Sequence, residues 1–125
     1  MDESIRQALS TGHTIDITTR GRKTGRARRI EIVFHNFDSR LFISGAPSPR
    51  KRSWIANLEA DPHFTFHLKD RAVTADLPAV ARVITDDAER RAILPLVAAA
   101  WRRRDLDVMV AYSPLIEVSL PTAEA

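Results

Sequence analysis

Apolar and polar residues alternate with a period of two in several segments of the first 84 residues, and this period is typical of β-strands. Ile15 and Ile17, for example, fall on one face of their segment, while Thr14, Asp16 and Thr18 fall on the other. The pattern predicts six strands, at residues 13–19, 28–35, 40–44, 64–68, 72–84 and 114–120. We expect the fifth to bend near Pro78, because proline cannot donate to a ladder.

Three segments carry helix signals instead. Residues 4–10 predict a short helix with Asp2 or Ser4 as its N-cap, and residues 51–60 predict a second one that ends at Asp61-Pro62. The longest helix is predicted to start at a Thr85 cap and to carry Arg102, Arg103 and Arg104 in its last turn, with a kink at Pro95.

The connections between the strands are short. Glycines bracket a basic turn at residues 20–25, a hairpin turn is expected at 36–39, and two prolines make residues 45–49 an irregular loop. Six strands without a repeating strand–helix alternation favour a small antiparallel barrel over a parallel sheet. We therefore predict a mainly β, single-domain protein over residues 1–125, with its core at about 13–120 and a loose tail at 121–125.

Composition narrows the chemistry. Of 125 residues, 44% are hydrophobic and 28% are charged, which is typical of a soluble globular domain. The absence of cysteine excludes disulfides, thiolate catalysis and cysteine-ligated metal sites. The longest apolar run, 92–101, is far shorter than the roughly 20 residues of a membrane span. With no secretory leader pattern at the start, the expected location is the cytoplasm without stable membrane insertion.

Positive charge is concentrated in two places. Residues 20–29 hold six bases and no acid, and residues 50–52 are three consecutive bases. The net charge is +3, so the chain outside these nine bases, with ten bases against sixteen acids, carries −6. Such a distribution favours a polyanion held at one place over a merely solvated basic face.

Several familiar motifs are missing. His63 and His67 are separated by roughly 13 Å of strand, too far for one metal ion, so no metal site is expected. The turn at 21–25 lacks the Gly-Lys-[Ser/Thr] of a phosphate-binding P-loop, and no Gly-x-Ser-x-Gly elbow indicates a serine hydrolase. Nucleic acid is disfavoured as a partner because few aromatic residues accompany the bases.

The remaining candidate is an anion site made from the basic turn and the start of the second helix. Arg22, Lys23 and Arg28 offer charge-assisted donors to phosphate or carboxylate groups. Residues 50–53 lie at or just before a helix N-terminus, where free backbone N–H groups also favour anions. These residues alone indicate binding and do not identify a reaction.

The ordered motifs add a family resemblance. Three motifs follow one another at the separations found in one family: Thr18-Thr19-Arg20-Gly21-Arg22-Lys23-Thr24-Gly25-x-x-Arg28, then Trp54-x-x-Asn57-Leu58, then Asp61-Pro62. The chain resembles the deazaflavin (coenzyme F-420)-dependent nitroreductases, which belong to the split β-barrel flavin and deazaflavin oxidoreductases. The resemblance covers about residues 13–120.

The resemblance implies a six- or seven-stranded split barrel with flanking helices, and hydride transfer from a reduced deazaflavin to a nitroaromatic, quinone or enone acceptor. Arg22, Lys23 and Arg28 would hold the cofactor's acidic tail, Ser44 and Gly45 would lie beside its ring, and Ser53 and Trp54 would close the pocket. The expected cofactor-binding residues are Arg22, Lys23, Thr24, Arg28, Ser44, Gly45, Arg50, Arg52, Ser53 and Trp54. The expected catalytic residues are Ser44, as a hydrogen-bond donor near the ring, and Tyr112, as a proton donor.

Departures from the family pattern leave alternatives open. Some members have a lysine where Gly45 stands, so Arg50 or Arg52 would replace that contact. Residues 106–113 contain one aromatic residue, Tyr112, where active members often have several. A non-catalytic relative that binds a fatty acid, or an oxidoreductase that binds FMN, therefore stays possible on the same fold. Pairing into a homodimer also stays open.

Overall fold

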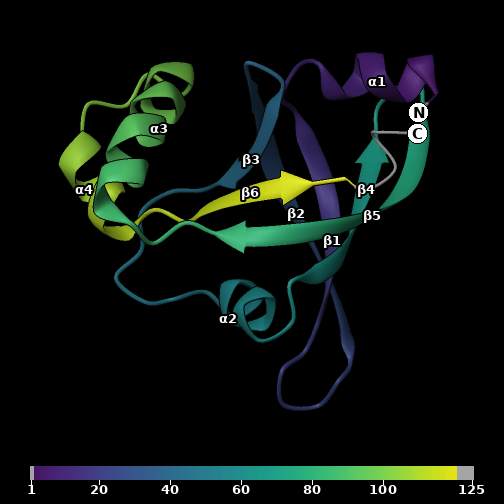
Figure 1. Ribbon diagram of the computed structural model, residues 1–125, viewed down its shortest axis with the longest axis horizontal. Coiled ribbons are helices and arrows are strands. Elements are labelled where there is room, and N and C mark those ends of the chain that lie inside the picture. The colour runs from purple at the N-terminus through teal and green to yellow at the C-terminus, as the bar shows by residue number, and fades with distance from the viewer. Residues whose placement is uncertain (1, 121–125) are drawn as a thin grey trace.

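Six antiparallel strands close into a barrel in the computed structural model, which describes residues 2–120 (Figure 1). The order around the barrel is β1-β2-β3-β6-β5-β4. The strands are β1 (Thr14–Arg20), β2 (Ala27–Phe37), β3 (Arg40–Ser44), β4 (His63–Lys69), β5 (Thr74–Val83) and β6 (Leu115–Ser119). The predicted barrel and its six strands are confirmed; the expected tail at 121–125 lies outside the described residues.

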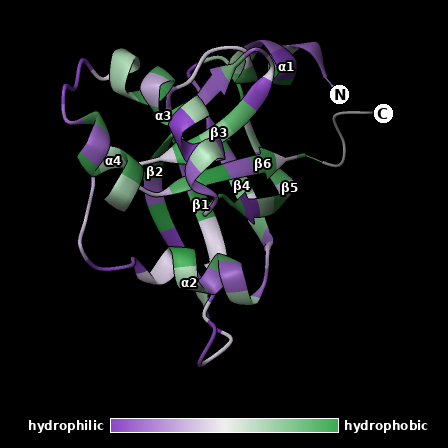
Figure 2. Cartoon of the chain, turned by 60° about the vertical axis from the view of Figure 1, so that its left-hand side comes forward, coloured by the Kyte–Doolittle hydropathy of each residue, from purple (hydrophilic) through white to green (hydrophobic). Residues whose placement is uncertain are grey.

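The barrel interior is filled by the apolar face of each strand. Ile15 and Ile17 of β1 are fully buried, and Phe34 of β2 meets Phe66 of β4 edge to face, with ring centroids 5.3 Å apart. Each such side chain contributes roughly 1.5–3 kcal/mol when buried. Figure 2 shows this alternation as green and purple residues interleaved along the strands. Apolar residues of each strand point into the barrel and form its core.

Four helices flank the barrel within residues 2–120. They are α1 (Glu3–Leu9), α2 (Ser53–Ala60), α3 (Asp87–Ala100) and α4 (Leu106–Tyr112). The α3 and α4 helices share a second apolar cluster with Phe42 and Leu115, on the outside of the barrel. They lie together on one side of the molecule in Figure 1, while α2 lies near the end from which the β1–β2 turn projects.

Three sequence predictions about the helices are wrong. The N-cap of α3 is Asp86, whose carboxylate accepts from the Glu89 amide at 2.9 Å, and Thr85 precedes it. The helix ends at Ala100, so the three arginines follow it: Arg102 has a left-handed φ of 55°, and Arg103 pairs with Asp105. Helix α4 was not predicted at all, because its seven residues are too few to show a clear period.

Pro78 is accommodated at a place where its missing N–H costs little. The amide of Ala81 donates to Pro62, on the β4 side of β5, at 2.8 Å. Since neighbouring residues of a strand direct their polar groups to opposite sides, the nitrogen of Pro78 faces the β6 side. Pairing with β6 begins only at Val80, so no ladder bond is lost there.

None of the helices in the described part of the chain is long and apolar enough to cross a bilayer.

Candidate functional site

A cavity of about 240 Å³ opens between the β1–β2 turn and the start of α2; we call it the basic cavity. Its lining is Gly21, Arg22, Lys23, Thr24, Arg28, Ser53 and Asn57. The turn is held by two backbone bonds of 2.8 Å, from Gly21 N–H to Arg26 and from Gly25 N–H to Gly21. Gly25 adopts a φ of 72°, which explains a glycine there. No acidic side chain among the described residues lines this cavity, so its electrostatic potential is positive.

The start of α2 adds backbone donors to the basic cavity. Arg52 is the N-cap, and its side chain caps no amide, while its carbonyl accepts from the amides of Ile55 and Ala56. The amide groups of Ser53 and Trp54 therefore have no partner among residues 2–120. Free amides and the positive end of the helix dipole favour an anion beside Ser53.

Asn57 joins the helix to the turn and was not identified as a site residue from the sequence. Its Oδ1 accepts from both the backbone N–H and the guanidinium of Arg22, each at 3.2 Å, and its Nδ2 donates to Thr19 Oγ1 at 3.2 Å. The side chain is 4% exposed. Asn57 therefore orients Arg22, and its presence in the Trp-x-x-Asn-Leu motif was the available signal.

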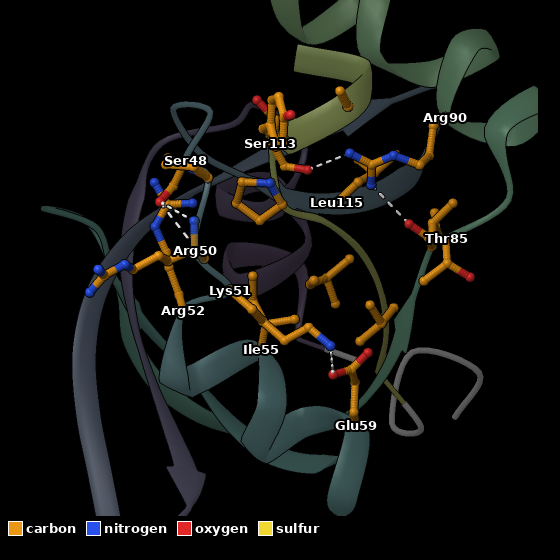
Figure 3. A pocket seen from close by; sticks show the side chains of 17 residues that line it. Ser48, Arg50, Lys51, Arg52, Ile55, Glu59, Thr85, Arg90, Ser113 and Leu115 are labelled. Atoms are coloured by element: carbon orange, nitrogen blue, oxygen red, sulfur yellow. Dashed lines mark hydrogen bonds and ion pairs between the residues drawn. The ribbon is translucent and has the colours of Figure 1, made fainter. Parts of the chain in front are cut away.

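A second cavity, of about 320 Å³, lies on the other side of the start of α2 (Figure 3). We call it the α4 cavity, because the end of α4 forms one wall; the 48–52 loop and the segment from Val83 to Thr85 form others. Ile55, Ile84 and Leu115 give it an apolar floor. Its volume lies in the range of small-molecule sites.

Cations surround this apolar floor, and three of the four have partners. Lys51 pairs with Glu59 at 2.7 Å, and Arg52 donates to the Ala46 carbonyl at 2.7 Å. Arg90 donates to backbone carbonyls. For the Arg50 guanidinium no hydrogen bond or ion pair is present within residues 2–120. One cation is thus left for a ligand, and the others shape the wall.

Arg90 secures α4, and sequence reasoning missed it. Its guanidinium donates to the carbonyls of Ile84 at 2.9 Å, Val110 at 2.8 Å, and Met109 and Ser113. Burial lowers the pKa of Arg90 from its ordinary value, although Asp87 opposes this. The sequence signal that could have identified Arg90 was its position on α3, one turn before the apolar stripe that contains Ile93 and Leu94.

The structure brings together most of the residues predicted for the cofactor. Arg22, Lys23, Thr24, Arg28 and Ser53 line the basic cavity. Arg50, Arg52 and Tyr112 line the α4 cavity. Not all of the clustered bases belong to the site. Arg29 pairs with Asp16 on the outer barrel surface, and Arg20 lines a separate cavity beside His63.

Ser44, Gly45 and Trp54 line neither cavity. Ser44 is 1% exposed and donates its hydroxyl to the Pro114 carbonyl at 2.6 Å, so that hydroxyl already has a partner. Gly45 packs closely on Pro114: a β-carbon there would lie 3.2 Å from its ring. Trp54 is half-buried and packs against the barrel core. The expected contacts of Ser44 and Gly45 with a ring, and the expected closing of the pocket by Trp54, stay predictions.

No group of three or more His, Asp or Glu side chains that could hold a metal occurs in residues 2–120. His67 instead bridges Thr18, at 2.6 Å, and Asp76, at 2.7 Å, on the outside of the barrel.

The barrel thus carries a basic cavity at the start of α2 and, next to it, a cavity with an apolar floor. The family model for the F420H(2)-dependent quinone reductase matches residues 3–112, and the chain belongs to this family. The protein is thus a deazaflavin-dependent oxidoreductase, as the sequence motifs predicted. None of the curated proteins matches the chain.

Solved structures show the same fold at low sequence identity. A structure described as an F420-H2 dependent reductase (FDR-A) has a TM-score of 0.60 and 19% identity over 85% of this chain and 93% of that one. A putative 5-nitroimidazole antibiotic resistance protein from Bacteroides thetaiotaomicron has a TM-score of 0.67 and 14% identity, over 97% and 80%. A domain-swapped dimer has a TM-score of 0.62 and 20% identity, over 85% and 79%.

Proposed function

We propose that this chain binds reduced deazaflavin with the anionic tail in the basic cavity and the ring toward the α4 cavity, where a quinone is the electron acceptor. The observation that carries the proposal is the pair of cavities on either side of the first turn of α2. Ser53 lines the basic cavity, while Arg52 and Ile55 line the α4 cavity, so one elongated ligand can contact both.

The residues present fit this cofactor. A phosphate with several carboxylates needs several donors that no protein acid already neutralises. Arg22, Lys23 and Arg28 meet this need, since no described acid lines their cavity, and the free amides at Ser53 and Trp54 add neutral donors. The flat ring needs an apolar wall, which Ile55, Ile84 and Leu115 provide.

The reduced deazaflavin, when bound, supplies the hydride. The protein binds the cofactor, orients it and excludes water from the site. Asn57 holds the Arg22 guanidinium on one side of the basic cavity, and Arg90 holds α4 over the other cavity by its backbone carbonyls. Both devices keep binding groups in place before the ligand arrives, which lowers the entropic cost of binding.

Titration with oxidised deazaflavin tests the proposal. We expect micromolar binding by the native protein, and a dissociation constant about 10- to 100-fold higher in Arg22→Ala/Lys23→Ala, because each lost charge-assisted bond is worth about 1.5–3 kcal/mol before compensation. FMN, titrated in parallel, should bind more weakly because it has one phosphate and no glutamate tail.

Arg26→Ala/Arg71→Ala is the matched control. It removes the same charge from exposed positions that line neither cavity, so its affinity should remain close to native. Equal losses in the two double variants would show that only net charge matters. Tighter binding of FMN or of a fatty acid than of deazaflavin would contradict the proposed ligand.

Two further expectations belong with this proposal. The neighbour described as a domain-swapped dimer supports pairing into a homodimer, the alternative that the sequence left open, and sedimentation analysis of the purified chain would test it. The cytoplasmic location stays a prediction, to be tested by fractionation.

A further inference from the structure

The α4 cavity carries more positive charge than its own acids neutralise. Its lining has four cations, Arg50, Lys51, Arg52 and Arg90, against one acid, Glu59. None of these residues lines the basic cavity, whose cations are a separate set. The anionic tail proposed for the basic cavity therefore leaves the charges of the α4 cavity unused.

Three of the four cations have no carboxylate partner within residues 2–120. Arg52 donates to the Ala46 carbonyl, Arg90 donates to backbone carbonyls alone, and Arg50 has no side-chain partner. Carbonyls carry no net charge, and burial lowers the pKa of Arg90, so its charge is held in the wall at a cost. An anion in the cavity offsets that cost, whereas a neutral group does not.

Lys51 places an accessible donor at the edge of this cavity. Its side chain is 57% exposed, and its Nζ lies 2.7 Å from the Glu59 carboxylate (Figure 3). An ammonium has three N–H donors, and Glu59 engages one of them. Arg50 is exposed as well, and a ligand can engage its guanidinium without breaking any bond within the described chain.

An apolar floor with accessible cations at its edge fits a flat ring that bears a carboxylate. The ring would lie on Ile55, Ile84 and Leu115, while the carboxylate would accept charge-assisted bonds at the edge. A neutral quinone would fill the floor in the same way but would leave the cations without a partner. The cavity therefore discriminates in favour of the charged compound.

We propose that the α4 cavity selects a quinone acceptor that carries a carboxylate substituent, and that Lys51 and Arg50 bind this carboxylate. This inference rests on the proposed function and names the substrate class of its acceptor site. In the balanced reaction, the quinone takes a hydride from the reduced deazaflavin and a proton from water, and the products are the hydroquinone and the oxidised cofactor. The carboxylate takes no part in the reaction and serves only for binding.

Two matched compounds test this selectivity: a menadione derivative that bears a propionic acid side chain, and its methyl ester. The quinone ring is the same, so the two differ by one charge. With saturating reduced deazaflavin, without oxygen and at low ionic strength, we expect kcat/KM of the native protein to be about 10-fold higher for the acid. In Arg50→Ala/Lys51→Ala the ratio of acid to ester should fall to about 1.

Thermal unfolding without any cofactor supplies a second readout. The acid should raise the Tm of the native protein more than the ester does, because a ligand that binds the folded state stabilises it in proportion to its affinity. This difference should be lost in Arg50→Ala/Lys51→Ala.

Two further variants bracket the result. Glu59→Gln removes the acid of the lining and frees the Lys51 ammonium, so it should raise the ratio of acid to ester above the native value. Arg26→Ala/Arg71→Ala is again the matched control, because it removes two positive charges from positions that line neither cavity. Its ratio should stay close to native.

A ratio of about 1 in the native protein, or an unchanged ratio in Arg50→Ala/Lys51→Ala, would overturn the inference. An equal fall in the control would also overturn it, by assigning the preference to net charge alone. Failure of the proposed function differs, because the native protein would then bind no deazaflavin and reduce neither compound. The thermal measurement would still show whether the protein prefers the acid.

Discussion

Asn57 shows how one buried amide couples the stability of this barrel to its ligand site. It satisfies the Arg22 backbone, the Arg22 guanidinium and the Thr19 hydroxyl at once. The residue thus belongs as much to the fold as to the basic cavity. The positive charge of the cavity attracts an anion, but the uncharged side chain of Asn57 fixes the position of the Arg22 guanidinium.

Asn57→Ala should therefore affect two measurements. Leaving the Arg22 amide and the Thr19 hydroxyl without partners should lower the free energy of unfolding by about 1–3 kcal/mol, measured in urea. Freeing the Arg22 guanidinium should also weaken deazaflavin binding. Arg28→Ala is the comparison: it removes a charge from the same cavity with no described hydrogen bond to break, so it should weaken binding at native stability. Native stability in Asn57→Ala would contradict the coupling.

At the scale of elements, the packing of α3 and its C-terminal Trp101 against β2 depends on a neutral histidine. His35 is buried, stacks on Phe37 with ring centroids 5.4 Å apart and meets Trp101 at 5.0 Å. Its Nε2 has no hydrogen-bond partner among residues 2–120. Burial lowers the pKa of His35, because the charged ring would lose its hydration.

This shift predicts a loss of stability in mild acid. The unfolded chain takes up a proton at His35 near pH 6.5, whereas the folded chain does so only at a lower pH. The unfolded state then binds more protons, so stability falls as the pH drops from about 7 through that window and levels off below the folded pKa. Urea unfolding at about pH 7 and pH 5.5 measures the difference, and His35→Phe should reduce it. An identical pH dependence in the two proteins would assign the effect to other groups.

At the scale of the whole molecule, positive charge collects around one helix start while the rest of the chain is acidic. The two cavities share that start, and six of the nine clustered bases line them: Arg22, Lys23, Arg28, Arg50, Lys51 and Arg52. Acids elsewhere are largely engaged on the outer surface; Glu117, for instance, joins Arg40 and Arg82 across three strands. The resulting field favours an anionic cofactor over a neutral acceptor.

Added salt should therefore weaken the binding of deazaflavin more than that of a neutral acceptor such as menadione. Raising the ionic strength from about 0.05 M to 0.5 M shortens the screening length from roughly 14 Å to 4 Å, so the deazaflavin dissociation constant should rise several-fold. The KM for menadione, which is neutral, should change little at saturating cofactor. Fluorescence titration and steady-state kinetics give the two quantities, and a parallel rise in both would contradict an electrostatic origin.

The barrel and the location of the basic turn could both be predicted from the sequence. Several of the strands follow from a local period of two, as in the segment that holds Ile15 and Ile17, and the turn follows from glycines and bases that are adjacent in the chain. The match to residues 3–112 confirmed the family that these motifs predicted. Local chemistry of this kind is readable because it depends on neighbours only a few residues apart.

Which side chains find a partner within the protein depends on contacts between segments far apart in the chain, and the sequence pattern does not show these contacts. Ser44 and Ser113 look alike in sequence, but Ser44 finds the Pro114 carbonyl 70 residues away, whereas the Ser113 hydroxyl finds no described partner. Likewise, Arg22 is oriented by a residue 35 positions along the chain, and Arg90 by carbonyls of a helix that the sequence did not reveal. The availability of a donor depends on closure of the barrel, which brings distant segments together, and no local pattern records that pairing.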